Sequence, residues 1–286
     1  MAGWSNQDIA EKLQELADLL EQQDANPFRV NAYRRAARTV ASHGESLAGI
    51  RRQGGIEGLE KLPAIGHSIA LAIDEMLGSG RWIQLERLRG ALDPEQVFRS
   101  IPGIGPRMAR RIHDQLHVDT LEALEIAAHD GRLEQVSGVG PRRARMITAA
   151  LGQMLQRRPG RSGRAAAEPP VGMLLDVDRE YRGKAAAGAL RKIAPRRFNP
   201  KGEMWLPILH AQGDGWNFTA LFSNTARAHE LGRTSDWVVL YFHSDDGPEG
   251  QRTVVTETSG PLKGRRVVRG REAECAGHYR EQAAIA

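Results

Sequence analysis

The sequence predicts a multidomain fold, with an all-α amino-terminal half built from repeated helical hairpins and a smaller α+β carboxy-terminal domain with an antiparallel sheet. A glycine turn between helical segments recurs three times before residue 155. The stretch QRRPGRSGRAAAEPP (156–170) has almost no bulky apolar residue and cannot bury a core. Strand-like runs and turn signals follow it, including a Gly-Asp-Gly between two apolar runs.

Helical periodicity organises the first half. Ser5 and Asp8 form a capping-box pattern ahead of apolar residues at helical spacing. The pair Asn26-Pro27 starts a second helix over 26–42, and GGIEGLEK is a short helix before the first glycine turn. From there to about Met154 we expect only helices and short turns.

The second half reads as strands with one short helix. We expect strands in VGMLLDV, on both sides of the turn in WLPILHAQGDGWNFTALFSN, and in DWVVLYFHS, QRTVVTETSG and RRVVRG. TARAHELG is a short helix capped by Asn224 or Thr225. The predicted division is a helical domain over 1–88, a tandem hairpin domain over 89–156, a flexible basic linker over 157–170 and an α+β domain over 171–286.

Composition excludes several classes of protein. Cys275 is the single cysteine, so one chain forms neither a disulfide nor a cysteine-based zinc site, and a reducing cytoplasm is the simple expectation. No apolar stretch is long enough to predict a membrane span. Aromatic residues are 5% of the chain, which argues against a large aromatic-lined cofactor cavity. We expect no required cofactor and leave open a monovalent cation at a hairpin turn.

The three turns align in register. They are LPAIGHSIALAI (62–73), IPGIGPRMARRI (101–112) and VSGVGPRRARMI (136–147), which place Gly66, Gly105 and Gly140 at one position. A chain that reverses between packed helices needs a positive φ or a very close backbone approach, and glycine permits both. We expect Gly105 and Gly140 to need a positive φ and to let a phosphate approach the backbone amides closely. The helix that follows each turn presents free N–H groups and a positive dipole end, which form an anion site.

Two of the turns also carry arginines, and the formal net charge is +5. Backbone amides and arginines together bind phosphates without reading bases. The alternative is a set of hairpins that only pack, with the arginines as a solvated face. The candidate DNA-binding residues are Gly66, Gly103, Gly105, Arg107, Arg110, Arg111, Gly138, Gly140, Arg142, Arg143 and Arg145.

These turns resemble helix-hairpin-helix motifs, and residues 5–155 resemble the amino-terminal part of family X DNA polymerases. The order of the motifs, their spacing and the phrase NAYRRAA carry this resemblance. It implies a first small domain that binds the 5′-phosphate side of a DNA gap, followed by hairpins that grip the flanking duplex. The implied phosphate pocket contains Arg29, Tyr33, Arg34, Lys61 and His67, although Tyr33 can equally be a half-buried core ring.

The chain departs from that family in two ways. Asp176-x-Asp178 echoes the metal-binding pair of the polymerase palm, but no Gly-Ser turn precedes it and too few residues follow for palm and thumb. The lysine that forms a Schiff base in family members with 5′-deoxyribose-phosphate lyase activity is matched by Ala72, which has no nucleophile. A phosphate-binding lysine is matched by Ser68. The resemblance therefore implies DNA binding without polymerase or lyase chemistry.

The carboxy-terminal half resembles no enzyme family. His243 with Asp245 is a weak metal-site candidate and can equally be a polar hairpin tip; Asp176 and Asp178 are the other weak candidates. The basic segments LRKIAPRRFNP and PLKGRRVVRGRE are a second nucleic-acid surface or a solvated face. Two functions follow: a sequence-nonspecific DNA-binding protein of DNA repair, or a DNA-processing enzyme, a metal-dependent nuclease or nucleotidyltransferase, with its active site in the second half. Protein partners stay unknown.

Overall fold

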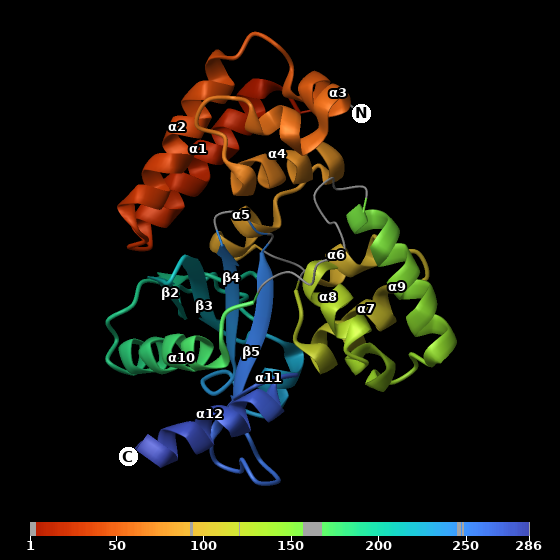
Figure 1. The fold of residues 1–286 in the computed structure, drawn as a ribbon, viewed down its shortest axis with the longest axis vertical. Helices are drawn as coiled ribbons and strands as arrows, with labels where there is room; N and C mark the ends of the chain where they lie inside the picture. The colour runs from red at the N-terminus through yellow and green to blue at the C-terminus, as the bar shows by residue number, and fades with distance from the viewer. Residues whose placement is uncertain are drawn as a thin grey trace.

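The computed structural model describes residues 4–91, 94–119, 121–156, 168–244, 247 and 249–285 (Figure 1). Its described elements confirm the predicted fold class, with helices in the first half and a sheet with helices in the second. The linker predicted over 157–170 lies outside the described residues as far as residue 167.

The first helical unit comprises five helices around one apolar core. They are α1 (Asn6–Gln22), α2 (Pro27–Ser42), α3 (Leu47–Glu60), α4 (His67–Ser79) and α5 (Ile83–Leu88). Ser5 and Asp8 form the predicted capping box, and the Asn26 side chain accepts a hydrogen bond from the Phe28 N–H. The helix expected in GGIEGLEK continues α3 across a kink at Gly55.

The second helical unit holds the tandem hairpins around a core of its own. Its elements are α6 (Pro94–Arg99), α7 (Pro106–Leu116), α8 (Leu121–His129), the short 3-10 helix η1 (Arg132–Gln135) and α9 (Pro141–Gln156). The repeated alanines and isoleucines of the motif, Ala109, Ile112, Ala144 and Ile147, lie in this core. Their helical spacing turns one apolar face inward and leaves the arginines outside.

The sheet is an antiparallel meander in which each strand pairs with its neighbours along the chain. The strands are β1 (Lys192–Ile193), β2 (Leu206–Gly213), β3 (Trp216–Phe222), β4 (Val238–Ser244), β5 (Gly250–Thr256) and β6 (Arg266–Val268). The predicted hairpin is β2–β3, and its turn places Asp214 and Gly215 at φ of 44° and 78°. These two positive φ values suit the turn to the twist of the strands.

Three helices accompany the sheet: α10 (Val171–Ala186), α11 (Ala226–Glu230) and α12 (Glu272–Ile285). The strand predicted in VGMLLDV is wrong, because these residues open α10. Val171, Leu174, Leu175 and Tyr181 are buried at helical spacing, a pattern that becomes visible only beyond the apolar run. The prediction also contained no helix over α12.

The sheet is buried on both faces. Leu209, Phe218 and Leu240 lie in one core with α10 and α12, whereas Ile208, Val239 and Tyr241 join the core of the first helical unit. In Figure 1, α10 and α12 lie on the side of the sheet away from α1–α4. The strand alternation therefore divides the side chains of one sheet between two different cores.

Candidate nucleic-acid interface

The three hairpin turns share one backbone geometry. The residue two places before the N-cap has a positive φ in each: 61° at Ala64, 86° at Gly103 and 86° at Gly138. The N-cap glycines are extended instead, with φ of −81° at Gly66 and −86° at Gly105, and Gly140 is likewise outside the left-handed region. The expectation that Gly105 and Gly140 need a positive φ is therefore wrong.

The N-cap glycines have a different physical role. A Cβ built on Gly66, Gly105 or Gly140 would meet no atom within 4 Å. Neither the backbone conformation nor the packing of the chain on itself requires glycine at these positions. The glycines leave the backbone open to a group from outside the protein, at the positive end of a helix.

The two tandem hairpins form one continuous surface. One hollow is lined by Gly103, Gly105, Arg107, Arg111 and Arg143, and a second by Gly103, Gly140, Arg142, Arg143 and Met146. Gly103 and Arg143 line both hollows. The Arg111 Nη1 donates to the Ser137 carbonyl at 3.2 Å, which joins the second hairpin to the third.

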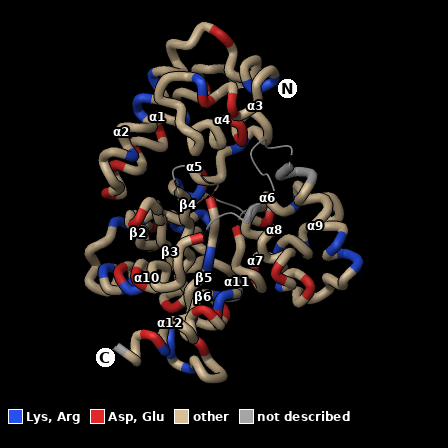
Figure 2. Tube along the Cα trace, in the orientation of Figure 1, with Lys and Arg blue, Asp and Glu red and all other residues tan. Residues whose placement is uncertain are grey.

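The arginines on this surface differ in what they already bind. Arg143 Nη1 donates to the Gly138 carbonyl at 2.5 Å, and Arg110 lies 3.5 Å from the Glu95 carboxylate. Arg107, Arg142 and Arg145 are exposed and take part in no ion pair within the described ranges. Figure 2 marks the basic residues of α9, which lie near the start of that helix. These three guanidinium groups are available for phosphates.

The first hairpin carries no comparable surface. Lys61 is exposed, His67 is paired with Glu60, and Arg34 binds Glu21 at 2.7 Å and Asp18 at 3.3 Å. His67 and Arg34 thus serve helix-to-helix contacts of the first unit, and Lys61 is the exposed cation of the three.

Two residues of the predicted five-residue phosphate pocket are withdrawn from solvent, Tyr33 fully and Arg29 in part. Tyr33 is 4% exposed and donates to Gln84 Oε1 at 3.3 Å; burial raises the pKa of its hydroxyl. Arg29 beside it has two guanidinium nitrogens buried without a hydrogen-bond partner within the described part of the chain. The Tyr33 ring also lies 6.0 Å from the Trp82 ring and belongs to the core of the first unit, so it is the core ring of the alternative.

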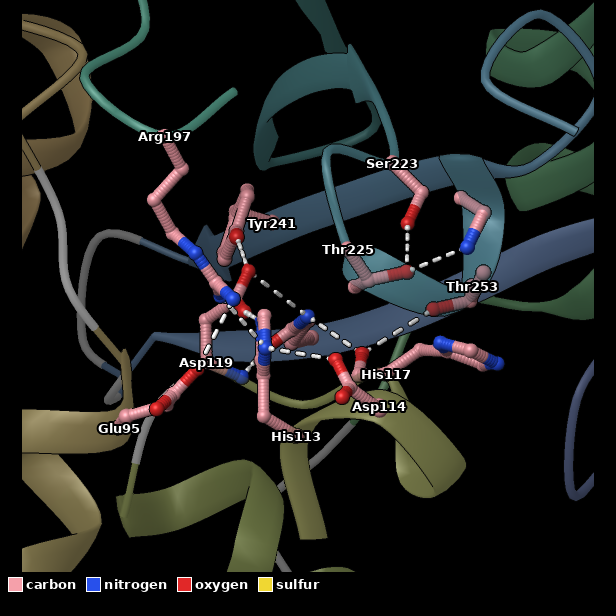
Figure 3. A network of polar contacts seen from close by, with 12 residues as sticks. Glu95, His113, Asp114, His117, Asp119, Arg197, Ser223, Thr225, Tyr241 and Thr253 are labelled. Carbon is pink, nitrogen blue, oxygen red and sulfur yellow. Dashed lines mark hydrogen bonds and ion pairs between the residues drawn. The ribbon is translucent and has the colours of Figure 1, made fainter. Parts of the chain in front are cut away.

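A buried polar network joins the sheet to both helical units, and Figure 3 shows its part around Asp119 and Tyr241. Asp119 accepts hydrogen bonds from His113 Nε2 at 2.7 Å and from the Tyr241 hydroxyl. Burial alone would raise the pKa of Asp119, but the hydrogen bond from His113 and those around it hold it below its ordinary value. Nearby, Arg87 forms a bidentate ion pair with Glu249 at 2.8 and 2.5 Å and lies over the Tyr241 ring.

This network is a structural connection. Its carboxylates are matched by cations or hydrogen-bond donors, and buried pairs of this kind fix how surfaces dock. Sequence reasoning missed it because its members are separated by up to 162 residues, as in the pair of Arg87 and Glu249.

Two of the weak metal candidates, Asp176 and Asp178, have different surroundings. Asp176 is exposed and paired with Arg179, while Asp178 is buried and binds Arg266 Nη2 at 2.6 Å. Residues two apart on a helix point in different directions, so this pair cannot share a metal. His243 is half-buried on β4 and lies near Arg29 of the first unit, and Asp245 lies outside the described residues. No three His, Cys, Asp or Glu side chains in the described part group as metal ligands.

The basic segment 261–272 is largely neutralised. Arg266 binds Asp178 and Asp236, Arg269 binds Glu257, and Arg271 binds Glu274. Lys263 and Arg265 are its exposed cations. This part of the proposed second nucleic-acid surface is therefore mainly a set of internal ion pairs.

Comparisons with known proteins show which protein families parts of the chain resemble. Residues 4–82 match the model of a helix-hairpin-helix domain, and residues 95–153 match that of a SAM-like helix-hairpin-helix tandem. The chain is also 26% identical over 174 residues to DNA polymerase/3′-5′ exonuclease PolX of Bacillus subtilis (strain 168). That similarity covers 60% of this chain and 28% of the relative. The amino-terminal region is thus similar to that of a family X polymerase, as the motifs indicated.

The described helices include none with the length and apolar character to cross a membrane.

Proposed function

We propose that this chain binds the sugar–phosphate backbone of duplex or gapped DNA with little sequence preference, as a protein of DNA repair. The helix-hairpin-helix matches and the similarity to PolX support DNA as the partner. Backbone amides and arginines bind phosphates, whereas short hairpin turns offer few groups to base edges.

One observation carries the proposal. Gly105 and Gly140 stand at helix N-termini with open space where a Cβ would be, between arginines that bind no carboxylate in the described chain. Glycine at these positions serves a partner that approaches the backbone, and charge identifies that partner as an anion. Two such positions on one surface suit the repeated phosphates of a duplex.

The proposal includes the absence of polymerase and lyase chemistry. Ala72, which matches the lyase lysine, is 6% exposed in the core of the first unit. An amine at that place would be buried, and the chain has none there. The aspartates Asp176 and Asp178 point apart and bind arginines.

A monovalent cation at a hairpin turn stays a prediction. Such a cation is bound by backbone carbonyls of the turn. In the third turn the carbonyls of Ser137 and Gly138 already accept hydrogen bonds from Arg111 and Arg143. The second turn is therefore the better candidate.

Binding can be tested by fluorescence anisotropy with gapped and continuous duplexes over a salt series. We expect a steep fall of log K with log salt and equal affinity for unrelated sequences. A preference for one sequence as strong as that of a repressor for its operator would contradict the proposal.

Chemistry is tested on the same substrates. Incubation with Mg²⁺ or Mn²⁺, with and without dNTPs, should give a mobility shift and no new DNA product. Borohydride treatment on an incised abasic substrate should trap no covalent adduct. A metal-dependent product would favour the enzyme alternative, and an adduct would show that another lysine has taken the lyase role.

A further inference from the structure

The loop between β1 and β2 exposes an aromatic ring at the cost of backbone strain. Phe198 has a φ of 52° and is 48% exposed. A bulky residue in the left-handed region is a strained conformational outlier. The chain thus keeps in solvent a large apolar side chain whose position also strains the backbone.

Phe198 is the outermost ring of an aromatic cluster. Its ring centroid lies 4.5 Å from that of His229, and the His229 ring lies 6.2 Å from Trp205 at an interplanar angle of 81°. We call Phe198, His229 and Trp205 the aromatic platform.

Asn224 holds the aromatic platform in place. Its Nδ2 donates to the Arg197 carbonyl at 3.0 Å, and its Oδ1 accepts from His229 Nε2 at 2.6 Å. One side chain therefore fixes both the backbone next to Phe198 and the orientation of the His229 ring. Burial and the neighbouring Arg197 lower the pKa of His229, which favours the neutral ring near pH 7.

The aromatic platform is tied to the second hairpin. Arg197 Nη1 donates to His113 Nδ1 on α7 at 2.9 Å, and Arg197 Nη2 donates to Glu95 at 2.9 Å. Glu95 also pairs with Arg110, one of the hairpin arginines. Figure 3 shows Arg197 reaching from its loop towards His113 and Glu95. The loop therefore borders the helix whose N-terminus carries Gly105.

The surroundings of Phe198 suit an anionic partner. Arg196 and Lys201 are exposed in the same loop, and the Lys201 Nζ comes no closer than 4.0 Å to the Glu203 carboxylate. Cations interleaved with exposed rings are the composition of surfaces that bind unpaired nucleotides. An apolar protein partner would need no such charge.

We propose that the aromatic platform stacks on an unpaired base of DNA whose adjoining duplex is held by the tandem hairpins. This inference rests on the proposed function and adds to it the means by which a gap is told from a continuous duplex. Stacking needs only the face of a base, so it is tolerant of sequence. Phosphate contacts alone do not distinguish gapped from continuous DNA.

The test uses the full chain with two DNAs of identical sequence, one continuous and one with a one-nucleotide gap opposite 2-aminopurine. Phe198→Gly removes the ring and relieves the strain at φ 52°, so the variant should fold with an equal or higher Tm. We expect its affinity for gapped DNA to fall about tenfold, while its affinity for continuous duplex stays that of the parent chain. Stacking should also quench the 2-aminopurine fluorescence with the parent chain and not with Phe198→Gly.

Two further variants separate stacking from apolar docking. Phe198→Trp should keep both the preference for gapped DNA and the quenching of 2-aminopurine fluorescence. Met204→Ala is the matched control, because Met204 lies in the same loop, is 67% exposed and has no ring. Its variant should behave like the parent.

The outcomes distinguish the two proposals. A Phe198→Gly chain that still prefers gapped DNA, or a Met204→Ala chain that loses the preference equally, overturns the aromatic platform and leaves the hairpin proposal standing. A parent chain that binds neither DNA overturns the proposed function itself.

Discussion

The first hairpin and the tandem hairpins have the same turn and different surroundings. Both place a positive φ two residues before an extended N-cap glycine, at Ala64 and Gly66 in one case and at Gly103 and Gly105 in the other. The tandem hairpins add arginines that bind no acid in the described chain, whereas the first hairpin has His67 paired with Glu60. Under the proposed function, the same turn serves packing in the first hairpin and phosphate binding in the tandem hairpins, where exposed arginines accompany it.

The two helical units also differ in how they meet the sheet. The first unit shares a core with one sheet face, which buries Tyr33 and the guanidinium of Arg29. The tandem unit touches the sheet through polar contacts such as those of Asp119 and keeps its hairpin turns exposed. The surface left for DNA is thus on the tandem unit.

The largest expected effect is a loss of stability on acidification. Protonation of two histidines should weaken the contact between the first unit and the sheet. Burial, with Arg29 nearby, lowers the pKa of His210 and of His243 to about 3. The unfolded chain takes up protons at a pKa of about 6.5, so stability is complete above that pH and falls as the pH drops towards 3. At pH 5 each histidine should cost about 2 kcal/mol of the free energy of unfolding, measured by denaturant titration.

The control for this prediction is His243→Gln, which does not titrate. The variant should show a shallower loss between pH 7.5 and pH 5 than the parent. An unchanged slope would place the protonation elsewhere in the chain.

The next largest effect is a loss of DNA binding when the N-cap glycines of the tandem hairpins are replaced. Gly105→Val and Gly140→Val should each weaken DNA binding about tenfold or more, because the side chain occupies the open space at the helix N-terminus. Gly105 is extended, a conformation that valine adopts readily, and Gly140 lies outside the left-handed region, so circular dichroism should show folded proteins. Gly66→Val should leave DNA affinity almost unchanged. Equal losses for all three variants would show that the first hairpin also binds phosphate.

At the positive-φ position, substitutions in the first and second hairpins should change the free energy of unfolding in opposite directions. Ala64→Gly should raise the free energy of unfolding by about 1 kcal/mol, because alanine at φ 61° is strained and glycine is not. Gly103→Ala at φ 86° should lower it by about 1–2 kcal/mol. Thermal unfolding of both variants measures the difference, and a loss of stability in Ala64→Gly would contradict the shared geometry.

The smallest effect concerns single arginines. Arg107→Ala or Arg142→Ala should lower the slope of log K against log salt by about one unit and weaken binding evenly across sequences. Arg34→Ala is the matched control, since Arg34 already binds Glu21 and Asp18. A salt slope reduced equally by Arg34→Ala would mean that the first unit contributes to the DNA surface.

Local features were determined by the sequence. The capping box of Ser5, the three hairpin turns and the β2–β3 turn at Asp214 and Gly215 each depend on residues within a few positions of one another. Such features follow from backbone sterics and hydrogen bonds that hold in any tertiary context. The strand predicted at 171–177 failed because a short apolar run fits a buried helix as well as a strand.

Only the tertiary structure decided which surfaces are covered. It placed Tyr33 against the sheet, paired Arg87 with Glu249 and turned Asp178 into a partner of Arg266. It also left Phe198 exposed beside the hairpin unit. Burial and charge pairing depend on contacts between segments far apart in the chain, and no local pattern of residue types encodes which face will meet which.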